Sequence, residues 1–203
     1  MSGFSKKEKA LIKKLDTPAK AQDYLNKLKF NFEPKGATLK SPLHTMRSSS
    51  AHCMEGALLG AYILKEHKYK PYLMLLKATD DDFDHVVVPF KVGGLWGALS
   101  KTNHVVLRYR EPVYKNIREL AMSYFHEYFL HNGKKTLRKY SELLDLNIFE
   151  KGWEVLDGDL WGIDDELDNI RHYDIVPKSY VNKLRKADEV EIKAGKIVEY
   201  VND

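Results

Sequence analysis

The chain contains a single cysteine, Cys53, near the start of the apolar run AHCMEGALLGAYIL, whose spacing is typical of a helix. A strand-like run, FDHVVVPF, follows and carries His85 near its start. Unpaired N–H groups in the first turn of a helix favour negative charge and stabilise a thiolate placed there. An imidazole on a neighbouring strand can take the thiol proton. These residues predict an acyl-transfer site with Cys53 as nucleophile and His85 as general base and later acid, the backbone N–H of Cys53 stabilising the oxyanion.

A third group must hold the His85 ring in the right orientation, and two residues are candidates. Ser100 has the better position, at the end of the next strand-like run, LWGALS. Asn103 has the better chemistry, because its amide oxygen can accept from a ring N–H. Asp84 adjoins His85 and would point to the opposite face of the strand. Ser100 and Asn103 therefore stand as alternatives for this role.

Four further residues are predicted to contact the substrate. Arg47 and Ser50 precede the cysteine, where an oxyanion donor or a substrate-facing loop would lie. His52 adjoins the cysteine and could tune its charge, while Trp96 could line an acyl-binding groove. Each has a plainer interpretation as a loop residue or a core aromatic side chain. Glu55 is interpreted only as a first-turn carboxylate that favours the helix dipole.

The elements that must position these residues follow from the hydrophobic pattern. They are helices at 5–30, a loop at 37–50, a helix at 51–66, strands at 70–78, 83–91 and 95–100, a helix at 112–130, a helical segment at 178–187 and a hairpin at 190–201. Thr17-Pro18 is typical of a helix start, and Gly93-Gly94 of a hairpin turn.

This element order predicts an α+β fold, in which a helix bearing the cysteine packs on an antiparallel sheet bearing the histidine, with flanking helices. We expect one domain over residues 1–203. Its core would span about residues 37–130, with N-terminal helices at 5–30 and a C-terminal extension from about 131 to 203 whose role the pattern leaves open.

The order of these motifs resembles the core of the transglutaminase-like family, within the papain-like cysteine group. That family carries Cys-x-x-x-Ala at a helix start, His-Val opening a strand, and Trp-x-x-x-Asp on the next strand. The matching residues are Cys53 with Ala57, His85 with Val86, and Trp96, with Ser100 where the family has Asp. The resemblance, over about residues 45–105, implies a papain/transglutaminase-like fold and hydrolysis or transfer of an amide or peptide bond. The alternative is an inactive scaffold of this type that binds a partner.

Composition narrows the classes of function. The 33 basic and 29 acidic residues give a net charge of +4 without a concentrated basic stripe, which argues against nucleic-acid binding. No apolar run is long enough for a membrane span or a signal peptide, and one cysteine cannot form an internal disulfide. We therefore expect a cytoplasmic protein without a membrane partner. A peptide or amide-containing molecule is the expected substrate, and the proposed chemistry needs neither a metal nor an organic cofactor.

Overall fold

The structure, a computed structural model, describes residues 3–201. Its centre is an antiparallel sheet with the strand order β6-β5-β4-β3-β7-β9, and β8 also pairs with β3. These strands are β3 (Tyr72–Lys77), β4 (His85–Val92), β5 (Leu95–Ser100), β6 (Arg110–Tyr114), β7 (Lys139–Ser141), β8 (Leu144–Asp145) and β9 (His172–Asp174). A separate parallel pair joins β1 (Lys29–Phe30) to β2 (Ser50–Ala51).

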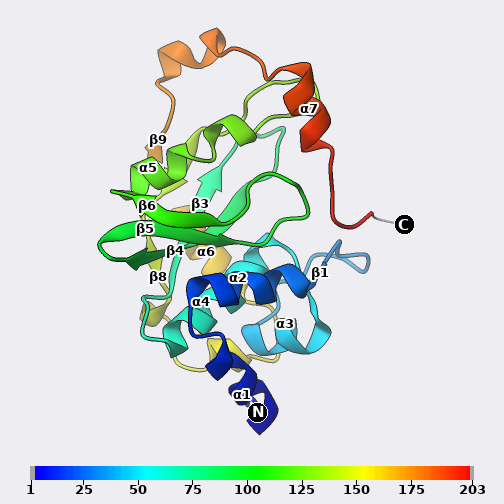
Figure 1. The fold of residues 1–203 in the computed structure, drawn as a ribbon, viewed down its shortest axis with the longest axis vertical. Coiled ribbons are helices and arrows are strands. Elements are labelled where there is room, and N and C mark those ends of the chain that lie inside the picture. The colour runs from blue at the N-terminus through cyan, green and yellow to red at the C-terminus, as the bar shows by residue number, and fades with distance from the viewer. Residues whose placement is uncertain (1–2, 202–203) are drawn as a thin grey trace.

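Helices cover both faces of this sheet (Figure 1). The α-helices within residues 3–201 are α1 (Lys6–Lys14), α2 (Pro18–Lys27), α3 (Pro42–Ser48), α4 (Cys53–Glu66), α5 (Ile117–Met122), α6 (Trp161–Asn169) and α7 (Glu189–Gly195). The side chains of α4 pack with Val86, Val88 and Leu99 in one apolar core. The side chains of α5 pack with Val87 and Ala98 in a second core. Successive residues of one strand thus fill different cores, as the two-residue repeat of a strand requires.

Two small residues let α4 lie close to the sheet. A Cβ on Gly56 would lie 2.4 Å from Cβ of Lys101, just beyond the end of β5. A Cβ on Gly60 would lie 3.1 Å from Leu99, an approach that neighbouring side chains can absorb more easily. The first turn of α4 is therefore pressed against the end of β5, which fixes where its N-terminus lies relative to the sheet.

The α+β class and the elements around the candidate site are confirmed. Thr17 caps α2 through its side chain and Pro18 occupies the first turn, as the sequence predicts. The predicted helix at 51–66 is α4, and the predicted strands at 70–78, 83–91 and 95–100 are β3, β4 and β5. Strands β4 and β5 pair in register from Val87 with Ser100 to Val92 with Leu95.

Three predicted elements are wrong. The loop at 37–50 contains α3 and β2. The helix at 112–130 is divided, because its first residues belong to β6 and Asn116 caps a new helix by accepting from the N–H of Glu119. The hairpin at 190–201 is the helix α7, which starts with a capping box between Asp188 and Glu191. The caps of α5 and α7 and the strand partner of β6 outweigh the apolar pattern, whereas α3 forms without a side-chain cap and buries Leu43 and Met46.

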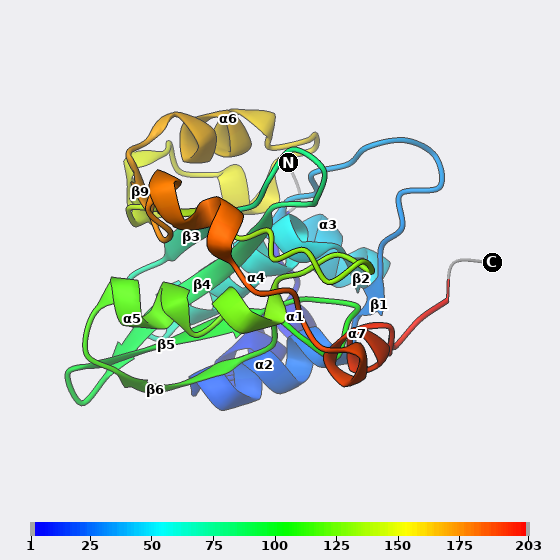
Figure 2. The ribbon, with the colours of Figure 1, turned by 90° about the horizontal axis from the view of Figure 1, so that it is seen from above.

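The C-terminal residues return to the sheet end that holds the candidate site. Figures 1 and 2 both place α7 and the chain after it on the side of the molecule where β1 lies. Val105 donates its N–H to the carbonyl of Ile197, and Glu199 donates its N–H to the carbonyl of Asn103.

Among residues 3–201, no helix has the length and apolar character needed to cross a membrane.

Candidate active site

Cys53 is the first residue of α4 and is partly exposed. His52 is the N-cap of the same helix. The N–H of Met54 lies 3.3 Å from Nδ1 of His52 and Gly56 donates to the carbonyl of His52, whereas the backbone N–H of Cys53 donates to no group among the described residues. Such a first-turn N–H is available to a bound anion or a developing oxyanion.

His85 opens β4 and Ser100 closes β5, at the same end of the hairpin. Because Val87 pairs with Ser100, His85 lies diagonally across from Ser100 on the same face. Nε2 of His85 lies 2.7 Å from Oγ of Ser100. The Ser100 hydroxyl donates its only hydrogen to the carbonyl of Leu107, at 2.5 Å, and therefore accepts from Nε2–H of His85. The neutral ring then has its lone pair on Nδ1, which is available as a base.

Ser100 is itself held by a side chain from α2. The amide of Gln22 donates to the carbonyl of Ser100 at 2.8 Å and accepts from its N–H at 2.9 Å. This amide therefore pairs with the last residue of β5 much as a neighbouring strand would. Gln22 and Ser100 are both buried, so the pairing satisfies backbone groups that water does not reach.

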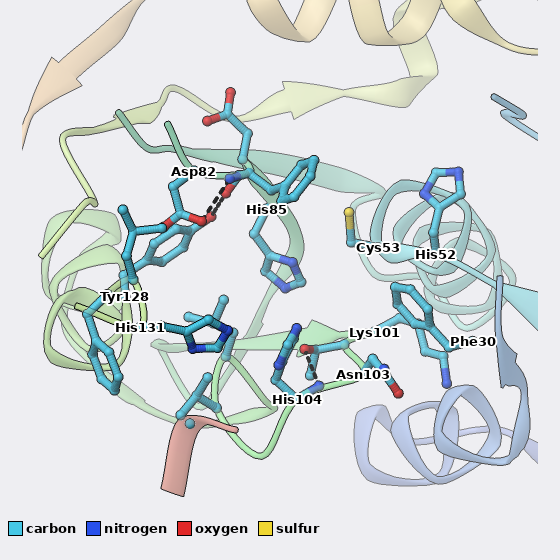
Figure 3. A pocket seen from close by; sticks show the side chains of 18 of the residues that line it. Phe30, His52, Cys53, Asp82, His85, Lys101, Asn103, His104, Tyr128 and His131 are labelled. Carbon is cyan, nitrogen blue, oxygen red and sulfur yellow. Dashed lines mark hydrogen bonds between the residues drawn. The ribbon is translucent and has the colours of Figure 1, made fainter. Parts of the chain in front are cut away.

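The thiol of Cys53 faces two imidazoles. Figure 3 shows the sulfur of Cys53 between the side chain of His52, beside it at the start of α4, and that of His85 on β4. Burial raises the pKa of Cys53, but hydrogen bonds with His52 and His85 outweigh it and lower the pKa from 9.0 to about 6. Burial lowers the pKa of His52, but its hydrogen bond to Cys53 and the charge of Glu55 raise it to about 9. The favoured state at neutral pH is therefore a thiolate beside an imidazolium.

Glu55 has a larger role than the sequence indicated, because it is a fully buried carboxylate, with 0% of the residue exposed. It accepts hydrogen bonds from the backbone N–H of His52 and of Lys40. The side chains of Asn31 and Thr38 donate to it as well. Since every one of these partners is a donor, the network fits the ionised carboxylate. The ammonium of Lys40 lies 3.4 Å away and supplies one positive charge.

Two cavities meet at Cys53. The larger, of about 630 Å³, is lined by Cys53, His52 and His85 together with aromatic side chains that include Phe30 and Tyr128 (Figure 3). The smaller, of about 300 Å³, also reaches Cys53 and His52 but not His85. Its other lining residues include Glu33, Asp84, Trp161 and Asp164. A molecule bound in either cavity can therefore approach the sulfur, and only the larger one gives it access to His85.

The remaining predicted residues lie in different surroundings. Asn103 lines the larger cavity, but its amide binds the backbone N–H and carbonyl of Tyr200 and not the His85 ring. Of the two candidates for orienting His85, the structure brings only Ser100 to the ring. Arg47 pairs with Glu8 on α1.

Ser50 and Trp96 also have other partners. The hydroxyl of Ser50 accepts from Lys40, and Trp96 lies toward the opposite end of β5, under the ammonium of Lys91. Arg47, Ser50 and Trp96 are described residues and line neither cavity, whereas His52 lines both.

Gln22 and Lys101 escaped the sequence analysis, which also interpreted Glu55 only as a first-turn carboxylate. Lys101 is 1% exposed, and its ammonium donates to the carbonyl of Leu28 at 2.5 Å. Burial lowers the pKa of this lysine. A polar residue at an apolar position was the available signal for Gln22, which lies among Pro18, Ala21 and Leu25 on the buried face of α2. Nothing in the local sequence marks Lys101 or the burial of Glu55.

No cluster of three or more His, Cys, Asp or Glu residues suited to a metal ion occurs within residues 3–201. Comparison with protein-family models finds no match, and comparison with curated proteins finds no relative.

Proposed function

We propose that this chain is a cysteine-dependent acyl-transfer enzyme of the transglutaminase-like type, acting on an amide or peptide bond. The proposal includes a papain/transglutaminase-like arrangement of the helix and sheet. Its main support is the thiol of Cys53 at a helix N-terminus, with its pKa lowered to about 6 by two imidazoles. The pair of His85 and Ser100 supports it further, because it leaves a ring nitrogen free as a base.

In this scheme the Cys53 thiolate attacks the carbonyl carbon, an S–C bond forms and the carbonyl electron pair moves to oxygen. The free backbone N–H of Cys53 donates to that oxygen, an interaction worth about 3 kcal/mol per donor in other enzymes. The C–N bond then breaks, and the amine leaves with the proton that the imidazoles hold. A thioester on Cys53 remains.

The second half-reaction regenerates the thiolate. Water or an amine attacks the thioester carbon while Nδ1 of His85 takes the proton from the attacking group. The S–C bond then breaks, the acyl group leaves as an acid or a new amide, and the proton taken by His85 replaces the one that left the imidazoles with the amine. Ser100 keeps the His85 ring in the tautomer that this step needs.

The test is capture of the acyl intermediate on Cys53. The protein is incubated with a panel of short peptides that carry chromogenic C-terminal amides, and its intact mass and amine release are followed. The proposal predicts a burst of released amine with an acyl mass on Cys53, absent from Cys53→Ala. Rapid alkylation of Cys53 by iodoacetamide without an acyl adduct from any peptide would instead favour a binding scaffold.

A further inference from the structure

The two imidazoles beside Cys53 differ in the charge of the group that holds them. His85 is held by Ser100, a neutral hydroxyl whose hydrogen is already donated to Leu107. His52 is held by Glu55, whose carboxylate accepts from the backbone N–H of His52 and has one oxygen 3.6 Å from its Nε2. A carboxylate stabilises an imidazolium, whereas a hydroxyl offers only a lone pair.

We propose that His52, and not His85, carries the positive charge that balances the Cys53 thiolate in the resting protein. His85 then stays neutral, and its Nδ1, the ring nitrogen left to interact with Cys53, acts as the base on the acyl acceptor. The carboxylate that compensates the imidazolium is Glu55, in the first turn of α4, and not a residue at the end of β5. This inference rests on the proposed function for the role of His85, but the location of the charge can be tested without it.

The hydrogen bond at Nε2 of His52 allows this charge state, whereas the long one at Nδ1 is exchanged for another when the ring is charged. Nε2 lies 2.8 Å from the carbonyl of Thr38, which only accepts, so Nε2 carries a hydrogen in every protonation state. Nδ1 is therefore the nitrogen that gains or loses the proton. In the neutral ring Nδ1 accepts from Met54, across a long 3.3 Å. In the charged ring Nδ1–H can donate to the adjacent thiolate, which is the stronger, charge-assisted interaction.

Two further carboxylates on the side of His52 favour its charged form. Glu33 is 3.8 Å from Nε2 of His52 and adds a second carboxylate on that side. Asp164, on α6, lines the smaller cavity together with His52. Lys40 opposes them, but it lies against Glu55.

On the other side, no carboxylate forms an ion pair with His85 within residues 3–201. Asp84, its neighbour in sequence, instead accepts from the N–H of Ala78. Asp82 and Asp84 line the larger cavity together with His85, but among the described residues the carboxylates within 4.0 Å of a nitrogen of either ring are Glu33 and Glu55, both beside His52.

The same arrangement explains how a serine can stand at position 100. In an acyl-transfer site with one histidine, the group that orients the ring is often a carboxylate, which also stabilises the imidazolium that forms. When a second histidine holds the proton beside its own carboxylate, the first needs only a group that fixes its tautomer. Ser100 does this through its oxygen. The departure from the family pattern at this position is thus balanced by His52 and Glu55.

The direct test is the imidazole ¹⁵N chemical shifts of the unmodified protein at about pH 7.5, between the ordinary pKa values of histidine and cysteine. We expect both nitrogens of His52 to be protonated, and His85 to carry hydrogen on Nε2 alone. A charged His85 beside a neutral His52 would overturn the inference. This measurement needs neither substrate nor a variant.

Variants give a second, independent readout through the pH dependence of iodoacetamide labelling. His52→Asn keeps a good N-cap without the ring, and Glu55→Gln keeps the shape of the carboxylate without its charge. Each should raise the labelling midpoint by about one pH unit, so that labelling near pH 6 slows about fivefold. The matched variant His85→Asn should raise it less.

A larger midpoint shift in His85→Asn than in His52→Asn would contradict the inference. Circular dichroism identifies a variant that has lost its fold, and the ¹⁵N measurement then decides. Failure of the proposed function alone would give another result. His52 would be charged and His52→Asn would shift the labelling midpoint more than His85→Asn, but no peptide would acylate Cys53.

Discussion

Oγ of Ser100 lies 2.7 Å from Nε2 of His85, so a neutral hydroxyl, not a carboxylate, holds this imidazole. The hydroxyl is fixed in turn, because it donates to the carbonyl of Leu107 and its backbone is paired with Gln22. This chain of contacts, from α2 through β5 to β4, sets which nitrogen of His85 can act as a base. The first two predictions test it.

Replacing Ser100 with alanine should free the His85 ring and leave the carbonyl of Leu107 without its donor. Loss of one such hydrogen bond costs about 1 kcal/mol of stability. We expect acyl transfer to fall about tenfold or more, because the ring can adopt the wrong tautomer. Steady-state kinetics of Ser100→Ala measure this effect. Ser141→Ala, which removes a buried hydroxyl that accepts from the N–H of Leu75 and lines neither cavity, is the matched control and should retain nearly full activity.

Replacing Gln22 with glutamate tests the two hydrogen bonds that Gln22 makes to the backbone of Ser100. The carboxylate can still accept from the N–H of Ser100 but can no longer donate to its carbonyl. Burial of the unpaired groups should lower the free energy of unfolding by about 2 kcal/mol. Urea denaturation measures the change, and Lys20→Gln, an exposed substitution on the same helix, serves as the control. Equal stabilities of Gln22→Glu and the unmodified protein would contradict this role.

Replacing Gly56 with alanine should destabilise the protein, although alanine favours a helix by about 1 kcal/mol. The added methyl would lie 2.4 Å from Cβ of Lys101, close to its backbone, where the neighbour cannot move freely. Overpacking of this kind costs about 1–3 kcal/mol. Gly60→Ala is the comparison, since its nearest neighbour is the tip of a leucine at 3.1 Å. Thermal unfolding should rank Gly56→Ala below Gly60→Ala, and the reverse order would be inconsistent with the packing.

The opposite pKa shifts of Cys53 and His52 predict that this pair adds little pH dependence to stability between about pH 7 and 8.5. The lowered pKa of Cys53, about 6, makes stability rise with pH until the unfolded thiol ionises near 9.0. The raised pKa of His52, about 9, makes stability fall with pH once the unfolded imidazole is neutral above 6.5. The folded and unfolded states therefore bind equal numbers of protons at these two residues in this window.

Urea denaturation across that window measures the balance. A stability that changed by about 1.4 kcal/mol per pH unit would mean that only one of the two residues has its pKa displaced. In His52→Asn the compensation is lost, and stability should rise with pH over the part of the window where the folded thiol is ionised and the unfolded thiol is not.

Replacing Asn103 with alanine should loosen the C-terminal residues without impairing the thiolate. The amide of Asn103 makes two hydrogen bonds to the backbone of Tyr200 and none to His85. Hydrogen exchange at residues 197–200 should therefore rise, while the iodoacetamide labelling midpoint of Cys53 stays within about 0.3 pH unit of its normal value. A large upward shift of that midpoint would reinstate Asn103 as the partner of the histidine.

The elements that carry Cys53 and His85 could be predicted because their signals are local. The helix start at Cys53, the β-branched residues after His85 and the turn at Gly93-Gly94 all lie within a few residues of the feature they determine. By contrast, β6 forms because β5 offers it a partner, and no pattern inside residues 110–114 reveals that. A local pattern contains no information on pairing between strands that are distant in the sequence.

The site divides in the same way. The choice between Ser100 and Asn103 depends on the register of β4 with β5 and on the C-terminal residues that bind Asn103. Both are properties of the tertiary structure. The role of Glu55 depends on the loop that brings Asn31 and Thr38 to it. A carboxylate in a first turn is usually exposed, so the sequence alone favoured the simpler interpretation.

The account depends most on the ionisation of Cys53, and the pH profile of iodoacetamide labelling of the native protein tests it directly. Because the chain has one cysteine, intact mass reports this site alone. The account predicts labelling that follows a thiolate with a midpoint near 6. A midpoint near 9.0, with the labelling rate of an ordinary free thiol, would contradict it.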